Sequence, residues 1–126
     1  MKSSESISKS REVATEGYLN RILINNSEKK IFVDIYDINW IESSGNYLKL
    51  HLENTTHLVR GTMKKMEKKL NPLRFMRIHR SFIVNVGMIK SISRSLSGDY
   101  KVRLENGREL KMSRNYKEAL DRFQLN

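Results

Sequence analysis

The sequence predicts a mainly β domain, and three features of the chain support that class. Apolar and polar residues alternate along several short segments, an arrangement that sends them to opposite faces of a strand. Turn-forming clusters of Asn, Ser, Gly and Glu separate these segments. Only residues 62–70 and 115–123 repeat their apolar side chains with the period of a helix. A chain of 126 residues fits one domain with a single core.

Residues 1–17 are polar, rich in Ser and poor in large apolar side chains, so we expect a flexible tail or the remnant of a linker. The β pattern begins at Tyr18, and residues 18–126 form the predicted domain. Its first strands are marked by alternating apolar residues, namely Ile22 and Ile24, then Ile31, Val33 and Ile35, then Leu48, Leu50 and Leu52. The run from Phe82 to Val86 is too continuously apolar for a half-exposed strand, and we expect it at the buried centre.

Two short helices complete the predicted fold. Thr62 is a suitable N-cap for the first helix, and Asn71 followed by Pro72 ends it. Ser113 is a suitable N-cap for the second. The two apolar stripes consist of Met63, Met66 and Leu70, and of Tyr116, Leu120 and Phe123. The first stripe is surrounded by four lysines that either contact phosphate or form a solvated face: Lys64, Lys65, Lys68 and Lys69.

Residues 100–112 form a predicted β-hairpin whose register can be derived from the pattern. Asn106 and Gly107 favour a tight turn. A two-residue loop would mix apolar and charged residues on each face, whereas a three-residue loop of residues 105–107 pairs Val102 with Leu110. We therefore predict the three-residue loop, with Gly107 in the left-handed conformation. The same register pairs Tyr100 with Met112, Arg103 with Glu109, and Lys101 with Lys111 on the outer face, where an anion above the two lysines would make their repulsion tolerable.

The positive charge of the chain is concentrated in its second half. The formal net charge is +10, and residues 60–126 alone carry seventeen basic and six acidic side chains. Several of these basic residues alternate with apolar ones in β segments, so a sheet with one apolar and one cationic face is expected. Such a face fits a polyanion, and nucleic acid is the leading partner. A generally solubilising surface is the alternative.

The residue types present exclude several kinds of chemistry. The chain has no Cys, which rules out disulfides, thiolate zinc sites and cysteine nucleophiles. No apolar run approaches the ~20 residues of a membrane-spanning helix, and no signal peptide is visible; we expect a soluble, cytoplasmic protein. His51 and His57 lack a further metal ligand in the pattern, so they are expected to be exposed strand residues. With no catalytic set and no phosphate-binding glycine loop, neither an enzyme nor a cofactor is expected.

Three polar clusters carry the residue types that bind DNA. Arg pairs with guanine and Asn with adenine through two hydrogen bonds, while Lys and Ser hold phosphates. The clusters are Ser44 to Tyr47, His79 to Ser81, and Ser113 to Asn115. The third lies where a strand runs into a helix, so its backbone N–H groups could also receive a phosphate. Ordinary polar loops and caps are the alternative, particularly for Ser113 and Asn115.

Together these segments resemble the LytTR family of bacterial DNA-binding domains. The central signature of the family is similar to residues 77–85 (RIHRSFIVN). Its opening is similar to residues 33–35 (VDI) and 41–47 (IESSGNY), and its closing segment to residues 111–116 (KMSRNY). The resemblance covers about residues 20–123 in the right order and spacing.

The resemblance implies an elongated domain of small stacked β-sheets and a cytoplasmic transcription regulator. Such domains usually follow a receiver domain phosphorylated by a sensor kinase, although this chain contains no receiver domain. They bind promoter direct repeats, sometimes as dimers, with loops in successive major grooves of bent DNA. The base-contacting positions carry over to Asn46, Tyr47, Arg80 and Arg114, although the loop at Asn46 and Tyr47 is shorter than in some members. Phosphate-contacting or supporting roles are expected for Lys49, His79, Ser81, Lys101, Lys111, Ser113 and Asn115.

Two other functions remain open from the sequence. An RNA-binding β module would expose aromatic residues for base stacking, and Tyr47 is the only aromatic residue expected to be well exposed. A protein-interaction or membrane-surface domain would carry exposed bulky apolar residues or a strongly amphipathic helix, which residues 62–70 do not match well. Duplex DNA is therefore the favoured ligand.

Overall fold

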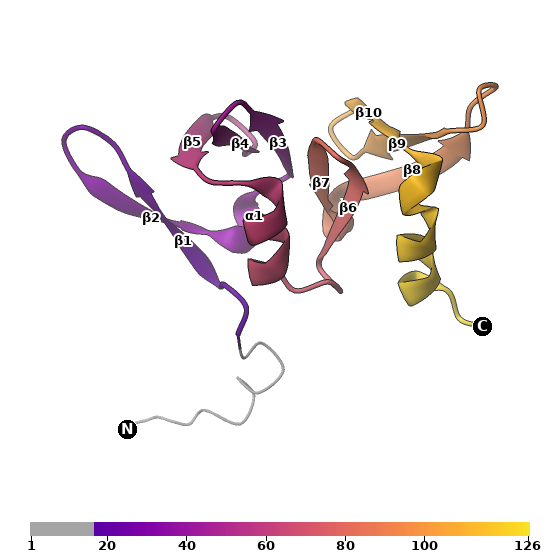
Figure 1. The fold of residues 1–126 in the computed structure, drawn as a ribbon, viewed down its shortest axis with the longest axis horizontal. Coiled ribbons are helices and arrows are strands. Elements are labelled where there is room, and N and C mark those ends of the chain that lie inside the picture. The colour runs from indigo at the N-terminus through magenta and orange to yellow at the C-terminus, as the bar shows by residue number, and fades with distance from the viewer. Residues whose placement is uncertain (1–16) are drawn as a thin grey trace.

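The computed structural model describes residues 17–126, so all but Gly17 of the predicted tail lies outside the described residues. Three small antiparallel sheets stand next to one another along the long axis of the molecule (Figure 1). A two-stranded sheet comes first, a five-stranded sheet is central, and a three-stranded sheet lies at the other end. This arrangement confirms the predicted class and its elongated stack of small sheets.

Among the described residues, strands contain more residues than helices. The two-stranded sheet consists of β1 (Arg21–Asn25) and β2 (Lys30–Asp34). The central sheet has the order β5-β4-β3-β7-β6 and consists of β3 (Trp40–Ser44), β4 (Tyr47–His51), β5 (Thr56–Arg60), β6 (Phe75–His79) and β7 (Phe82–Asn85). The third sheet has the order β10-β9-β8 and consists of β8 (Ile89–Arg94), β9 (Tyr100–Leu104) and β10 (Glu109–Met112). Two short 3₁₀ turns, η2 (Ile35–Asp37) and η3 (Val86–Met88), each precede a strand.

The central sheet is covered on both faces, which produces two hydrophobic clusters. On one face, Ile41, Leu50 and Ile83 pack with α1 and the β1–β2 hairpin. On the other face, Trp40 and Val84 pack with the third sheet. The prediction of a single core is therefore wrong, because strands β3 and β7 alternate apolar residues towards both sides. Of the run from Phe82 to Val86 that was predicted to be buried, residues 83–85 are buried and the two end residues are half-buried.

Helix α1 (Met63–Lys69) forms as predicted. The Thr62 hydroxyl accepts a hydrogen bond from the Lys65 N–H at 3.2 Å, which caps the first turn. The predicted stripe of Met63, Met66 and Leu70 is buried, and the four lysines of this segment are exposed. The helix thus covers one face of the central sheet with its apolar side.

The second helix differs from its prediction in three respects. It is a 3₁₀ helix, η4 (Arg114–Phe123), and it begins one residue earlier than expected. Ser113 caps it as predicted, but Ala119 joins Tyr116 and Leu120 against the core. Phe123 remains 40% exposed, because the last turn extends past the neighbouring strands (Figure 1).

The β9–β10 hairpin has the predicted register. Val102 pairs with Leu110, and residues 105–107 form a three-residue loop closed by a hydrogen bond from the Gly107 N–H to the Leu104 carbonyl at 2.9 Å. Gly107 has a φ of 92°, in the left-handed region that disfavours residues with a side chain.

Replacing Gly107 with Val is expected to lower the free energy of unfolding by about 1–2 kcal/mol, because a β-branched residue is strained at positive φ. Gly107→Asn is the control, since Asn tolerates this conformation better and should cost less. Urea denaturation of both variants measures the difference. An unchanged stability of the Val variant would contradict the importance of this turn.

Candidate nucleic-acid interface

Three turns from distant parts of the chain follow one another along the upper side of the molecule in Figure 1. They are the β3–β4 turn with Asn46, the β6–β7 turn with Arg80, and the start of η4 with Arg114; we call these three residues the turn row. All three side chains are exposed. The sequence therefore identified positions that the fold brings to a common edge.

Backbone hydrogen bonds connect the three segments that carry the turn row. The Ser43 N–H donates to the Ser81 carbonyl at 3.0 Å, which ties the β6–β7 turn to β3 next to the first turn. The Ser113 N–H donates to the Ile78 carbonyl at 2.9 Å, which ties the start of η4 to the end of β6. Main-chain contacts therefore contribute to the relative positions of the three turns.

A β-bulge makes the second of these contacts possible. Arg77 pairs with Ile83 and His79 pairs with Phe82, so Ile78 is an extra residue on β6. The Ile78 side chain is fully buried in the cluster under the third sheet. Bulges bend a strand and redirect its groups, and here the bulge carbonyl is directed to the N–H of Ser113.

The Arg77 side chain stabilises the β6–β7 turn by donating hydrogen bonds to its backbone. Its guanidinium donates to the Arg80 carbonyl at 2.7 Å and to the His79 carbonyl at 3.3 Å. The same group pairs with Glu67 of α1 at 3.2 Å and lies 5.8 Å from the Tyr116 ring centre. The sequence pattern placed Arg77 on an outer cationic face, and no local signal distinguishes it from a surface arginine. Its partners come from α1 and η4, which only the fold brings together.

His79 supports the same turn. Its Nδ1 accepts a hydrogen bond from the Ser81 N–H at 3.1 Å, which requires a ring without a proton at Nδ1. Burial is the main cause that lowers the pKa of His79 below its usual value of 6.5, and the charges of Lys111 and Arg80 add to this effect. At neutral pH the ring is therefore uncharged, with Nε2 as its N–H donor. Ser81 contributes its backbone to the turn.

Replacing His79 with Asn is expected to flatten the pH dependence of stability just below pH 6.5. Because the folded pKa of His79 lies below the unfolded value, the unfolded wild-type chain binds more protons in that window. Wild-type stability should therefore fall as pH drops through it, whereas Asn accepts the Ser81 hydrogen bond without titrating. Melting temperatures between pH 7.5 and 5 measure the difference. Parallel profiles for the two proteins would contradict this role of His79.

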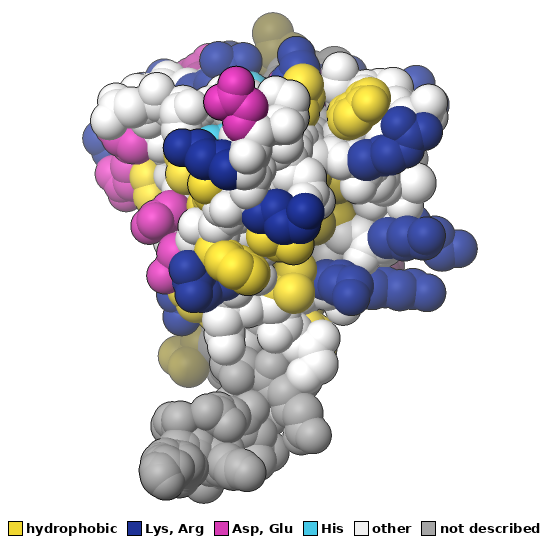
Figure 2. All heavy atoms as spheres, turned by 90° about the vertical axis from the view of Figure 1, so that its left-hand side faces the viewer, with side chains coloured by type: hydrophobic (Ala, Val, Ile, Leu, Met, Phe, Trp, Pro, Cys, Tyr) yellow, Lys and Arg dark blue, Asp and Glu magenta, His cyan; other side chains and the backbone are white. Residues whose placement is uncertain are grey.

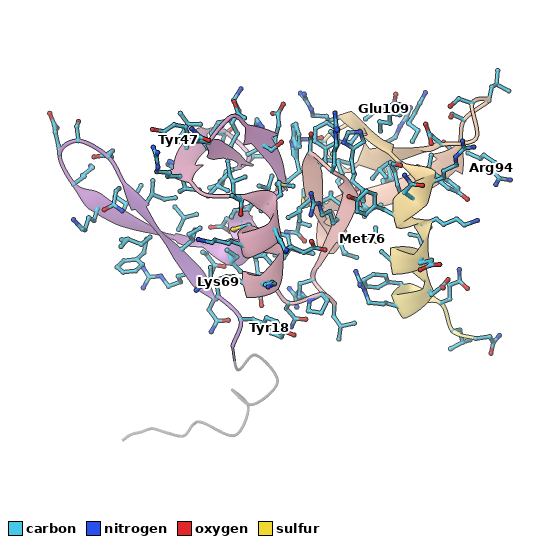
Figure 3. All side chains as sticks on the ribbon, viewed as in Figure 1. Tyr18, Tyr47, Lys69, Met76, Arg94 and Glu109 are labelled. Atoms are coloured by element: carbon cyan, nitrogen blue, oxygen red, sulfur yellow. The ribbon has the colours of Figure 1, made fainter. Side chains whose placement is uncertain are left out.

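The β3–β4 turn carries Asn46 and Tyr47. Gly45 has a φ of 61°, and Ser44 pairs with Tyr47, which leaves a two-residue turn. Tyr47 is 42% exposed and carries the Arg60 guanidinium over its ring at 5.6 Å. Tyr47 and Glu109 both lie along the upper edge in Figure 3. Lys49 follows on the same face of β4 and is half-buried.

Lys101 and Lys111 face each other on the β9–β10 hairpin as predicted. Carboxylates of the protein already offset the repulsion between the two lysines, because each lysine lies near one of them. Lys101 Nζ is 3.7 Å from Glu109, and Lys111 Nζ is 3.5 Å from Asp99. A hydrogen bond from Arg103, helped by the charge of Lys101, lowers the pKa of Glu109. The two lysines are exposed and lie on a surface of mixed charge.

The start of η4 does not offer free N–H groups to a phosphate. The Asn115 N–H donates to Ser113 Oγ at 3.2 Å, and the Arg114 N–H donates to Asp99 Oδ1 at 3.3 Å. The Tyr116 N–H donates to the Ser113 carbonyl at 2.9 Å. The alternative of an ordinary cap is therefore favoured for this helix start, and Ser113 provides that cap.

Two further sequence predictions need correction. His51 and His57 are both half-buried and are not exposed histidines. His51 stacks on Trp40 with ring centres 4.0 Å apart and contacts Glu42 at 2.9 Å. Tyr47 is not the only well-exposed aromatic residue, because Phe32 is 58% exposed beneath Arg21 on the β1–β2 hairpin. Figure 2, viewed from that end, shows exposed apolar side chains among Lys and Arg.

Among residues 17–126, no helix is both long and apolar enough to cross a membrane.

Residues 28–124 match the family model described as the LytTr DNA-binding domain.

Proteins with similar sequences include a bacterial sensory transduction protein and a bacterial transcriptional regulatory protein. The chain is 27% identical over 104 residues to the sensory transduction protein LytT of Bacillus subtilis, covering 82% of this chain and 43% of that protein. It is 34% identical over 67 residues to the transcriptional regulatory protein LytR of Staphylococcus aureus, covering 53% of this chain and 27% of that protein. The chain thus spans less than half of these relatives.

A solved structure has the same fold. It is a LytTr DNA-binding domain from Bacillus cereus, with a TM-score of 0.73 and 23% sequence identity. The match covers 82% of this chain and 95% of the solved one.

Proposed function

The chain belongs to the LytTR family of DNA-binding domains, and we propose that its turn row contacts bases in the major groove of a specific duplex. In this proposal Asn46, Tyr47, Arg80 and Arg114 contact base edges. Arg and Asn side chains form paired hydrogen bonds with guanine and adenine, and one such pair discriminates between bases by about 1–3 kcal/mol.

The proposal rests mainly on the position of three exposed side chains on neighbouring turns. Exposed Asn46, Arg80 and Arg114 project from three turns that backbone hydrogen bonds tie together. Around them, phosphate contact or support of a turn is proposed for Lys49, His79, Ser81, Lys101, Lys111, Ser113 and Asn115. Buried Ile78 and half-buried Arg77 anchor the β6–β7 turn. The exposed tip of this turn therefore keeps its position although it lies outside the core.

The biological setting is also a proposal. LytT and LytR are named as a sensory transduction protein and a transcriptional regulatory protein, and this chain matches only part of each. We propose that it acts as the output domain of a cytoplasmic response regulator, downstream of a receiver domain and a sensor kinase. Promoter direct repeats, each occupied by one copy of the domain, are the proposed targets.

Selection of bound duplexes from a random pool, at two salt concentrations, tests this function. A steep salt dependence together with enrichment of spaced direct repeats supports specific duplex binding. A steep salt dependence without enrichment contradicts sequence recognition and leaves a non-specific cationic surface.

An RNA-binding module is the second candidate, because Phe32 and Tyr47 expose aromatic rings. Arg60 already lies over the Tyr47 ring, and Phe32 belongs to the two-stranded sheet and not to the turn row. Duplex DNA therefore remains the favoured ligand. Competition of the selected duplex with single-stranded RNA distinguishes the two functions, since an RNA module would release the duplex.

A further inference from the structure

We propose that the β8–β9 loop, residues 95–99, positions Arg114 for its base contact, and that Asp99 is the residue chiefly responsible. This inference rests on the proposed function of the turn row. Asp99 was not among the residues identified from the sequence, because it is an acidic residue in a loop that is distant from Arg114 along the chain.

The first observation is the contact between Asp99 and the backbone of Arg114. Asp99 Oδ1 accepts the Arg114 N–H at 3.3 Å, and Asp99 Oδ2 lies 3.5 Å from Lys111 Nζ. The carboxylate therefore connects the end of β10 with the first residue of η4. The hydrogen bond from Arg114 is the main cause that lowers the pKa of Asp99, so the group stays charged at neutral pH.

The second observation concerns the Arg114 side chain. A Cβ atom at Gly98 would lie only 3.1 Å from Arg114 Nη1, so the guanidinium runs directly alongside the loop backbone. Gly98 also has a φ of 94°, which suits glycine. The loop thus contacts Arg114 at both ends, at the backbone N–H through Asp99 and at the guanidinium through Gly98.

The loop is ordered enough to serve as a support. The Ser95 N–H donates to the Asp99 carbonyl at 2.8 Å, and the Gly98 N–H donates to the Ser95 carbonyl at 3.1 Å. The Ser95 hydroxyl also donates to the Asp99 carbonyl at 3.0 Å. Arg94, labelled in Figure 3 at the end of β8, lies 5.6 Å from the Tyr100 ring centre and flanks the loop.

The negative charge of Asp99 allows a positioning role to be distinguished from a purely electrostatic effect. A carboxylate near a DNA-binding edge repels phosphates, so its removal alone raises affinity for any duplex. A positioning role predicts the opposite for the specific duplex, because Arg114 loses its support. The two effects have different signs and can be separated in one titration series.

The experiment compares Asp99→Ala and Asp99→Asn with wild type on the selected duplex and on a random duplex. Asp99→Ala is expected to weaken specific binding by about tenfold, within the range for losing one base-contacting arginine, and to strengthen random binding slightly. Asp99→Asn keeps an oxygen acceptor for the Arg114 N–H and should retain most of the specific binding. Asp121→Ala, which removes an exposed acidic group from η4, is the matched control and should preserve the ratio of specific to random affinity.

A double-mutant cycle distinguishes positioning from a general structural effect. In an Arg114→Ala background, Asp99→Ala should bring no further loss of specific binding. The inference is overturned if Asp99→Ala strengthens binding to both duplexes alike, if it weakens both alike, or if its loss adds fully to that of Arg114→Ala. If wild type itself prefers no sequence, the proposed function fails and this inference fails with it.

Discussion

Replacing Arg114 with Ala is expected to weaken binding to the selected duplex by about 1–3 kcal/mol and to relax the base preference at one position. The side chain is exposed at the start of η4, where the helix caps are provided by Ser113 and Asp99. The truncation therefore removes a donor pair from the proposed base contact and leaves the fold intact. Affinity for random duplexes should change little, and the melting temperature should stay near that of wild type.

Lys64→Ala is the control for this result. Lys64 is an exposed lysine of α1, and its loss should lower affinity for specific and random duplexes alike. Fluorescence anisotropy with both duplexes at fixed salt measures the two ratios. Equal losses for Arg114→Ala on both duplexes would show that this arginine contacts phosphate and not a base.

Replacing Trp40 with Ala is expected to lower the free energy of unfolding by about 3–5 kcal/mol. Trp40 is only 3% exposed and lies in the cluster that joins the central sheet to the third sheet. Its ring stacks on His51 and meets Phe82 edge-on at 5.6 Å. The Arg108 guanidinium of the β9–β10 turn lies 4.7 Å from the ring centre.

Phe32→Ala is the matched control, because Phe32 is an aromatic residue that is 58% exposed. Its replacement should cost far less than that of Trp40, and Arg108→Ala should cost about 1 kcal/mol at most through the lost cation–π contact. Urea denaturation followed by circular dichroism measures all three. Similar losses for Trp40→Ala and Phe32→Ala would contradict the assignment of Trp40 to the joint between the sheets.

Local patterns predicted the elements of this fold well. The period-two alternation of Leu48 and Leu50 gives a strand, and the Thr62 cap with its methionine stripe gives α1. The register of residues 100–112 follows from the turn at Gly107 and from the pairing of apolar residues with apolar residues on the same face of the hairpin. These properties depend on neighbours along the chain, so the sequence contains them directly.

Features that depend on distant contacts were missed. The pairing of β3 with β7 creates two clusters in place of one core, and the bulge at Ile78 provides the carbonyl that accepts the Ser113 N–H. For the candidate interface, the sequence indicated the exposed turn residues and the supporting His79 and Ser113, but it did not indicate Arg77 or Asp99. Arg77 and Asp99 look like ordinary surface charges until the fold brings Glu67 and Arg114 beside them.

The exposure of the turn row has a consequence for the evolution of target choice. Asn46, Arg80 and Arg114 lie outside both hydrophobic clusters, and surface substitutions of this kind usually change stability by less than about 0.5 kcal/mol. The groups that hold the turns, by contrast, are backbone amides and partly buried side chains behind them. Under the proposed function, a lineage could exchange one tip residue for another and acquire a new operator while the scaffold keeps its stability.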